Sequence, residues 1–154
     1  MKKIIELRKL TEHFYQDYPH SLYPEIEQKK GRPYVVLLVE INNNLFAIPL
    51  RTNIRHSFCY KFKNTGRSTN SSTGIDFTKA IVVLKQSYLG EETSIDDKEY
   101  LEIQKKAFFI ISQFRKYVEG YVMARTTETN PYLKKKYKYT SLDYFADYII
   151  KKNK

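Results

Sequence analysis

The chain contains very little cysteine, histidine and glycine, and it has no tryptophan. Its single cysteine, Cys59, excludes an internal disulfide, and its place between Phe58 and Tyr60 is typical of a buried thiol rather than a nucleophile. The three histidines lack the paired spacing of zinc ligands, and no carboxylate cluster suited to a two-metal nuclease stands out. The five glycines are scattered, which leaves no glycine-rich phosphate loop. We therefore expect no metal and no cofactor.

The chain also lacks an apolar run long enough to cross a bilayer. Its opening, MKKIIELRKL, is too short and too charged for a signal peptide, so we expect a cytoplasmic protein. The 154 residues show no repeat and no internal boundary, which favours a single domain over residues 1–154. Hydrophobic residues make up 42% and aromatic residues 15% of the chain, enough for a folded core.

Positive charge and tyrosine are abundant. Lysine and arginine number 27 against 17 acidic residues, a formal net charge of +10. This imbalance predicts a polyanionic partner, with nucleic acid ahead of an anionic membrane surface. The 14 tyrosines suit stacking on unpaired bases, although half-buried tyrosines and solubilising lysines remain the alternative interpretation.

Two apolar runs in the first third of the chain predict a β-hairpin. Tyr34–Val39 and Leu45–Leu50 are separated by Asn42-Asn43-Asn44, and asparagine tolerates the positive φ of tight turns. Because an antiparallel hairpin brings its open ends together, Arg32 before the first strand should approach Arg51-Thr52 after the second. The segment after the hairpin is polar and basic and contains Arg51, Thr52, Asn53, Arg55 and His56.

The rest of the chain predicts an α+β fold. We expect short strands at Ile4–Leu7, Ser57–Phe62, Ile75–Phe77 and Ala80–Leu84, a helix within Lys9–Tyr18, and a surface loop at Lys63–Gly74. One long helix over Ile95–Val122, capped by Ser94, should bury a stripe made of Leu101, Phe108, Ile111, Phe114 and Val118. We expect a loop or an edge over Thr126–Lys138, and a last helix over Leu142–Lys151, capped by Thr140 or Ser141. The expected architecture is a compact antiparallel sheet or half-barrel flanked by helices.

The basic end of the hairpin suits metal-free RNA cleavage. In that reaction the 2′-hydroxyl attacks the adjacent phosphorus, so the protein must move protons and stabilise charge on the phosphoryl oxygens. Arginine can stabilise the charge on the phosphoryl oxygens, and threonine can orient the hydroxyl or the phosphate. His56 is the nearby group suited to proton transfer at neutral pH. A solvated strand end remains the alternative for Arg51-Thr52, and a packing histidine remains the alternative for His56.

The segment RPYVVLLVEINNNLFAIPLRTN resembles the toxins of type III toxin–antitoxin systems, the ToxN/AbiQ family, and within it the CptN-like and TenpN-like branches. Members share a basic residue before an apolar strand ending in Glu-Ile, then a strand ending in Pro-Leu and hydroxyl residues. Those positions are here Arg32, Glu40-Ile41, Pro49-Leu50 and Thr52. The opening KIIELRKLTEHFYQDYP and the Gly74–Phe77 segment are similar to further family signatures, and the likeness covers most of residues 1–120.

The resemblance implies a twisted antiparallel sheet similar to that of the MazF/Kid toxins, and a metal-independent endoribonuclease. Such an enzyme leaves a 2′,3′-cyclic phosphate and a 5′-hydroxyl, and can abort phage infection by cutting cellular or phage mRNA. Its implied partner is a small repeated antitoxin RNA, often a pseudoknot, which the toxin cuts from a precursor and with which it forms closed protein–RNA oligomers.

Carried over by position, Thr52 stands where the family has its important serine, Arg32 where members carry lysine, and Arg51 in place of a second hydroxyl residue. We therefore expect Thr52 to orient the nucleophile or phosphate, the two arginines to neutralise charge, and His56 to carry a proton. Arginine itself cannot act as the base. The residues expected to contact RNA are Tyr23, Lys29, Lys30, Asn53, Arg55, Lys63, Arg67, Lys134, Lys135 and Lys136.

Two other function classes fit the same residues. A non-catalytic RNA- or DNA-binding module would use the basic face only to grip phosphate, and a protein-interaction module would be basic incidentally. For the run Lys134–Lys136, a solvated lysine face is the alternative to RNA contact.

Overall fold

The computed structural model describes residues 5–26, 28, 34–63, 72–127 and 131–151. The predictions made for Lys29, Lys30, Arg32 and Arg67 lie outside these residues. The expected approach of Arg32 to Thr52 therefore stays a prediction.

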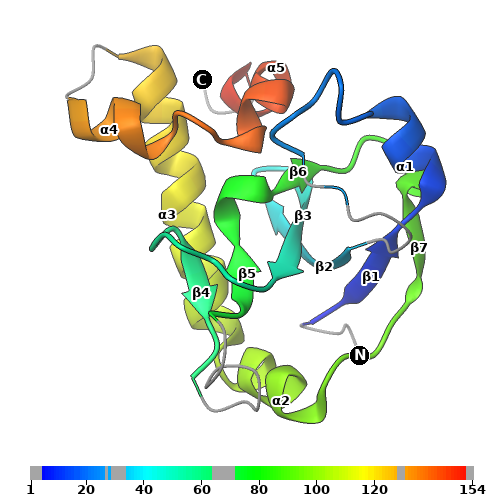
Figure 1. The fold of residues 1–154 in the computed structure, drawn as a ribbon. Coiled ribbons are helices and arrows are strands. Elements are labelled where there is room, and N and C mark those ends of the chain that lie inside the picture. Colours follow the sequence, from blue (N-terminus) through cyan, green and yellow to red (C-terminus); the bar gives the residue numbers. More distant parts are fainter. Residues whose placement is uncertain (1–4, 27, 29–33, 64–71, 128–130, 152–154) are drawn as a thin grey trace.

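The chain forms an open, antiparallel sheet with helices around it, which confirms the predicted α+β class (Figure 1). The strand order is β4-β5-β3-β2-β1-β7, and β6 pairs with β3 off this path. The strands are β1 (Leu7–Leu10), β2 (Val35–Ile41), β3 (Asn44–Arg51), β4 (Cys59–Lys61), β5 (Gly74–Asp76), β6 (Ile81–Val82) and β7 (Leu89–Glu92).

The helices are of very different lengths. The α-helices are α1 (Glu12–Asp17), α2 (Asp97–Lys105), α3 (Ala107–Thr126), α4 (Pro131–Lys136) and α5 (Ala146–Lys151), and the 3₁₀ turns are η2 (Phe77–Lys79), η3 (Gln86–Tyr88) and η4 (Ser141–Phe145). The long helix α3 runs along one side of the molecule, and α4 and α5 lie near its C-terminal end (Figure 1). In the part of the chain that the structure describes, no helix is long and apolar enough to span a bilayer.

The predicted hairpin is the centre of the sheet. β2 and β3 pair from Val36↔Pro49 to Ile41↔Asn44, so the turn has two residues rather than three. Asn42 and Asn43 both have positive φ, at 52° and 66°, which is the geometry of the turn that matches the twist of a hairpin. The third asparagine, Asn44, belongs to β3, where its side chain donates to the Tyr148 carbonyl at 3.3 Å.

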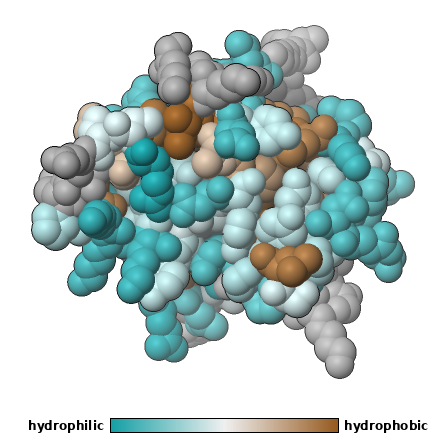
Figure 2. Space-filling view, turned by 90° about the horizontal axis from the view of Figure 1, so that it is seen from above, coloured by the Kyte–Doolittle hydropathy of each residue, from teal (hydrophilic) through white to brown (hydrophobic). Residues whose placement is uncertain are grey.

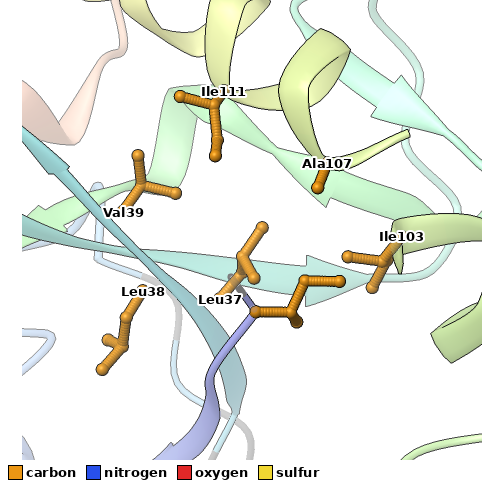
Figure 3. Close-up of a pocket in the computed structure, with 7 residues that line it drawn as sticks. Leu37, Leu38, Val39, Ile103, Ala107 and Ile111 are labelled. Atoms are coloured by element: carbon orange, nitrogen blue, oxygen red, sulfur yellow. The ribbon is translucent and has the colours of Figure 1, made fainter. Parts of the chain in front are cut away.

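Alternate side chains of the hairpin bury opposite faces of the sheet. Leu37 and Val39 point toward Ala107 and Ile111 of α3, and Leu38 points to the other side (Figure 3). Opposite Val39, Phe46 packs against the Phe114 ring of α3 at 5.1 Å. The opposite face of the hairpin packs against other parts of the chain. The mostly apolar residues that meet there are Leu10, Ile26, Tyr34, Val36, Ala47, Pro49, Lys79 and Ile81. The runs are continuously apolar because both faces are covered.

The prediction of one helix over Ile95–Val122 is wrong in one respect. The helix breaks at Lys106, whose φ of −105° and ψ of 14° separate α2 from α3. The predicted apolar stripe is also wrong in part, since Leu101 is 51% exposed and Phe108 is 77% exposed. The buried residues of the two helices are instead Glu99, Ile103, Ala107, Ile110, Phe114, Tyr117, Val118, Tyr121 and Ala124.

Several boundaries also differ from the predictions. Asp96, rather than Ser94, caps α2, because its carboxylate accepts from two backbone N–H groups. The segment 126–138, predicted as a loop or an edge, contains α4. The first residue of this helix is Pro131, and proline suits the first helical position. Thr140 caps η4, which leads into α5. The first strand falls at Leu7–Leu10, later than expected, and β7 was not predicted.

Candidate functional site

The candidate site forms where β3 ends and the chain returns across β5. Arg51, the last residue of β3, pairs with Gly74, and Asp76 of β5 pairs with Cys59 of β4. Between β3 and β4 the chain makes a tight loop, in which Asn53 has a φ of 55° and Ile54 donates to the Ser72 carbonyl at 2.9 Å. This loop carries His56 back to the end of β5.

Asp76 is the centre of the site. Its carboxylate is fully buried, and its Oδ2 accepts from Arg51 Nη1 at 2.5 Å. Its Oδ1 lies 3.2 Å from His56 Nε2 and accepts from the Thr78 hydroxyl at 2.7 Å and the Thr78 backbone N–H at 3.0 Å. One buried acidic group therefore holds an arginine, a histidine and a threonine together.

Asp76 is ionised in this environment. Burial alone would raise the pKa of its carboxyl, but hydrogen bonds from His56, Thr78 and Arg51 more than offset that effect. The net result is a pKa below the ordinary value of aspartic acid. The negative charge of Asp76 thus neutralises one positive charge at the site, and the Arg51–Asp76 pair is close to neutral.

Both ring nitrogens of His56 are engaged. Nδ1 accepts the Phe58 backbone N–H at 3.0 Å, which places the proton of the neutral ring on Nε2, facing Asp76. The ring also stacks on Phe58, with centroids 5.8 Å apart and planes at 25°. The role of His56 as proton carrier stays a prediction, and Nδ1 must exchange the Phe58 amide for a substrate group before it can accept a proton.

Thr52 follows Arg51 directly and is half-buried. Among the residues that the structure describes, its hydroxyl makes no hydrogen bond, so it is available to a ligand. Asn53 and Arg55 are exposed on the same loop. The structure therefore places three of the predicted site residues, Arg51, Thr52 and His56, at one end of β3.

Lys136 of α4 connects the predicted basic run to this site. Its ammonium group lies 5.3 Å from the centroid of the Phe58 ring, and Phe58 stacks on His56. It also lies 5.4 Å from the Tyr137 ring and 5.9 Å from the Tyr117 ring. Desolvation in this position lowers the pKa of Lys136. Lys136 is thus packed against aromatic rings, unlike its exposed neighbours Lys134 and Lys135.

The surface around α4 and α5 is mostly hydrophilic, with separate apolar patches between the polar side chains (Figure 2). Exposed Lys134 and Lys135 belong to α4. Tyr23 does not present an open ring, since it packs edge-on against Tyr18 at 4.9 Å and Tyr144 at 5.0 Å. Lys63 lies at the far end of β4, beside α2.

Two residues of the site were missed from the sequence, Asp76 and Thr78. The signal was present, because an acidic residue stands between the apolar residues Ile75 and Phe77 and a threonine follows it by two positions. That spacing is typical of a carboxylate capping a short turn, and Asp76 does cap η2. Within the described ranges, no three His, Cys, Asp or Glu residues gather into a group that could hold a metal ion.

Gly74 sets the close approach of β4 and β5 and so positions Asp76. A Cβ at this residue would lie 2.0 Å from the Tyr60 carbonyl oxygen and 2.9 Å from Lys61 Cα, both backbone atoms. Gly74→Ala should therefore separate the two strands and lower the free energy of unfolding by about 3 kcal/mol. Urea denaturation measures this.

Gly90→Ala is the matched control for that substitution. Its added Cβ would lie 3.1 Å from the Lys9 carbonyl oxygen, so the expected loss is much smaller. Equal losses in the two variants would contradict the assigned role of Gly74.

No protein-family model matches the chain, and no curated protein matches it in sequence. Among solved structures, the chain has the fold of a protein studied in a bacterial type III toxin–antitoxin system, in which a non-coding RNA pseudoknot selectively inhibits the toxin. The TM-score is 0.66, the sequence identity is 14%, and the match covers 94% of this chain and 96% of that one.

Proposed function

We propose that this protein is the endoribonuclease toxin of a type III toxin–antitoxin system. It cuts RNA without a metal ion, leaving a 2′,3′-cyclic phosphate and a 5′-hydroxyl. The observation that carries the proposal is a fold shared over nearly the whole chain with a protein of such a system, together with Thr52 beside the Arg51–Asp76–His56 cluster. The net charge of +10 supports an RNA partner.

The residues of the cluster divide the work of the reaction. Thr52 orients the 2′-hydroxyl or donates to a phosphoryl oxygen, and a donor held in place stabilises the charge that develops there. Asp76 fixes the Arg51 guanidinium at the end of β3 by its 2.5 Å contact. Because Asp76 also cancels the charge of Arg51, a further cation is needed, and Arg32 takes that role by resemblance. His56 carries a proton once its Nδ1 exchanges the Phe58 amide for substrate.

The partner of the proposed toxin is a small repeated antitoxin RNA, which it cuts from a precursor and which then blocks its site. Toxin and RNA would assemble into closed oligomers in the cytoplasm, with cellular or phage mRNA as the substrate when the antitoxin is lost. Membership of the CptN-like and TenpN-like branches rests on the hairpin segment that ends in Pro49-Leu50-Arg51-Thr52.

A non-catalytic RNA-binding protein is the second candidate. One observation favours it: both ring nitrogens of His56 and one guanidinium nitrogen of Arg51 are bound within the protein. In that case the cluster is a structural support for an RNA-binding loop.

Cleavage of RNA in the presence of a chelator separates the candidates. The purified protein is incubated with RNA transcribed from the region upstream of its gene, with EDTA in excess over any divalent metal ion. The proposal predicts discrete products with cyclic phosphate and 5′-hydroxyl ends, at a rate unchanged by EDTA. Intact RNA that stays bound to the protein would support the binding module instead.

A further inference from the structure

A second open site lies between β4 and the junction of α2 and α3. It has a volume of about 330 Å³ and is lined by Tyr60, Lys63, Lys98, Leu101, Glu102, Lys105 and Lys106. It shares no lining residue with the Arg51–Asp76–His56 cluster. A cavity of this size can take one nucleotide.

The floor of this pocket is held in place by hydrogen bonds. The buried Tyr60 donates its hydroxyl to Glu102 Oε2 at 2.6 Å, and the Lys63 backbone N–H lies 3.0 Å from Oε1 and 3.1 Å from Oε2. Burial and the hydrogen bond to Glu102 raise the pKa of Tyr60, so its phenol stays protonated as the donor. These contacts tie α2 to β4, and the pocket is therefore formed before any ligand arrives.

The rim of the pocket is strongly basic. Four of its seven lining residues are lysines, all exposed, against one carboxylate, Glu102. In the described part of the chain, none of these lysines forms an ion pair with a carboxylate. Unpaired ammonium groups converging on one hollow attract an anion such as phosphate.

One exposed aromatic side chain, that of Phe109, adjoins the same pocket through Tyr60. Phe109 is 53% exposed, and its ring lies 6.2 Å from the Tyr60 ring at an angle of 71°. Leu101, on the pocket wall, is also largely exposed. A simple phosphate would leave these apolar groups in water, whereas a nucleotide covers them with its base. Stacking on an exposed ring is how proteins hold unpaired bases.

We propose that this pocket binds a nucleotide of a single-stranded RNA, with a backbone phosphate among the lysines and the base against Phe109 and Leu101. The protein then holds RNA at two separate places. The inference rests on the proposed function only in taking RNA as the partner, and it does not depend on cleavage.

Binding of an uncleavable RNA tests the proposal. The probe is a fluorescein-labelled 12-nucleotide 2′-O-methyl RNA, about the length of a single-strand binding site, titrated with the full chain by fluorescence anisotropy. Lys98→Glu/Lys105→Glu should raise the Kd at least about tenfold and reduce the dependence of log K on log salt by about 1.4, because two phosphate contacts are lost. Phe109→Ala should raise the Kd about tenfold through lost stacking.

Arg115→Glu/Lys116→Glu is the matched control, because it changes the net charge equally on exposed residues of α3. It should change the Kd by less than about threefold. Equal weakening by the two double variants would overturn the proposal in favour of general charge attraction. An unchanged Kd in Phe109→Ala would also overturn it and leave a simple anion site. If AMP binds more tightly than the RNA, the ligand of the pocket is a free nucleotide rather than an RNA strand, and the proposal is overturned.

A cleavage assay on the same variants keeps the two proposals apart. Loss of RNA affinity at the pocket with normal 2′,3′-cyclic phosphate formation from saturating RNA supports the pocket and the proposed nuclease together. If the pocket variants weaken RNA binding but the unmodified protein cleaves no RNA, the proposed nucleotide pocket is supported and the proposed nuclease activity is overturned.

Discussion

Replacing Thr52 with alanine is expected to reduce the rate of RNA cleavage by about a hundredfold or more at saturating RNA. Thr52 is half-buried, its hydroxyl makes no hydrogen bond among the described residues, and it follows Arg51, which Asp76 anchors. A donor that acts on charge formed only in the transition state affects kcat more than binding. RNA affinity should therefore change by less than about threefold.

Two further variants make this result specific. Thr52→Ser keeps the hydroxyl and should retain most of the activity. Ser112→Ala removes a hydroxyl from an exposed position of α3, outside the Arg51–Asp76–His56 cluster, and should leave the rate unchanged. Single-turnover cleavage and anisotropy measure the two quantities separately. A Thr52→Ala protein that cuts RNA at the normal rate would remove Thr52 from the mechanism.

Replacing Asp76 with asparagine is expected to lower the free energy of unfolding by about 3 kcal/mol, because it leaves Arg51 without its buried partner. The carboxylate is fully buried and accepts from Arg51, His56 and Thr78. An amide of the same shape must direct an N–H group at one of these donors. Urea denaturation monitored by circular dichroism measures the change.

The contribution of Asp76 to the free energy of unfolding should depend on pH. The pKa of Asp76 is lower in the folded protein than in the unfolded chain, so its contribution is present above the unfolded value of about 3.9. The contribution is lost as the pH falls through the lowered folded pKa. The difference in stability between the original protein and Asp76→Asn should therefore be largest near neutral pH and shrink below about pH 4.

Asp147→Asn is the control for the Asp76 substitution. Asp147 is exposed in the first turn of α5, and its replacement should cost less than about 1 kcal/mol. A stability difference at Asp76 that stays constant down to pH 2, about two units below the ordinary pKa, would contradict the assigned ionisation.

The central hairpin was predictable because its signals are local. The apolar runs of β2 and β3 and the asparagines that accept positive φ act on neighbouring residues, and no distant contact overrides them. The basic segment after β3 was predictable for the same reason. The break at Lys106 was not predicted, because no proline or glycine marks it in the sequence.

The sequence by itself determined the hairpin, the excess of positive charge, and the place of Arg51, Thr52 and His56 at the end of β3 and just after it, since each depends on residues close together in the chain. Only the tertiary structure decided which groups meet there. Asp76 joins Arg51 and His56 from a separate strand, and Lys136 reaches the Phe58 ring from a helix near the other end of the chain. A buried carboxylate must be neutralised by whatever donors surround it, and those donors are chosen by the pairing of strands rather than by sequence distance.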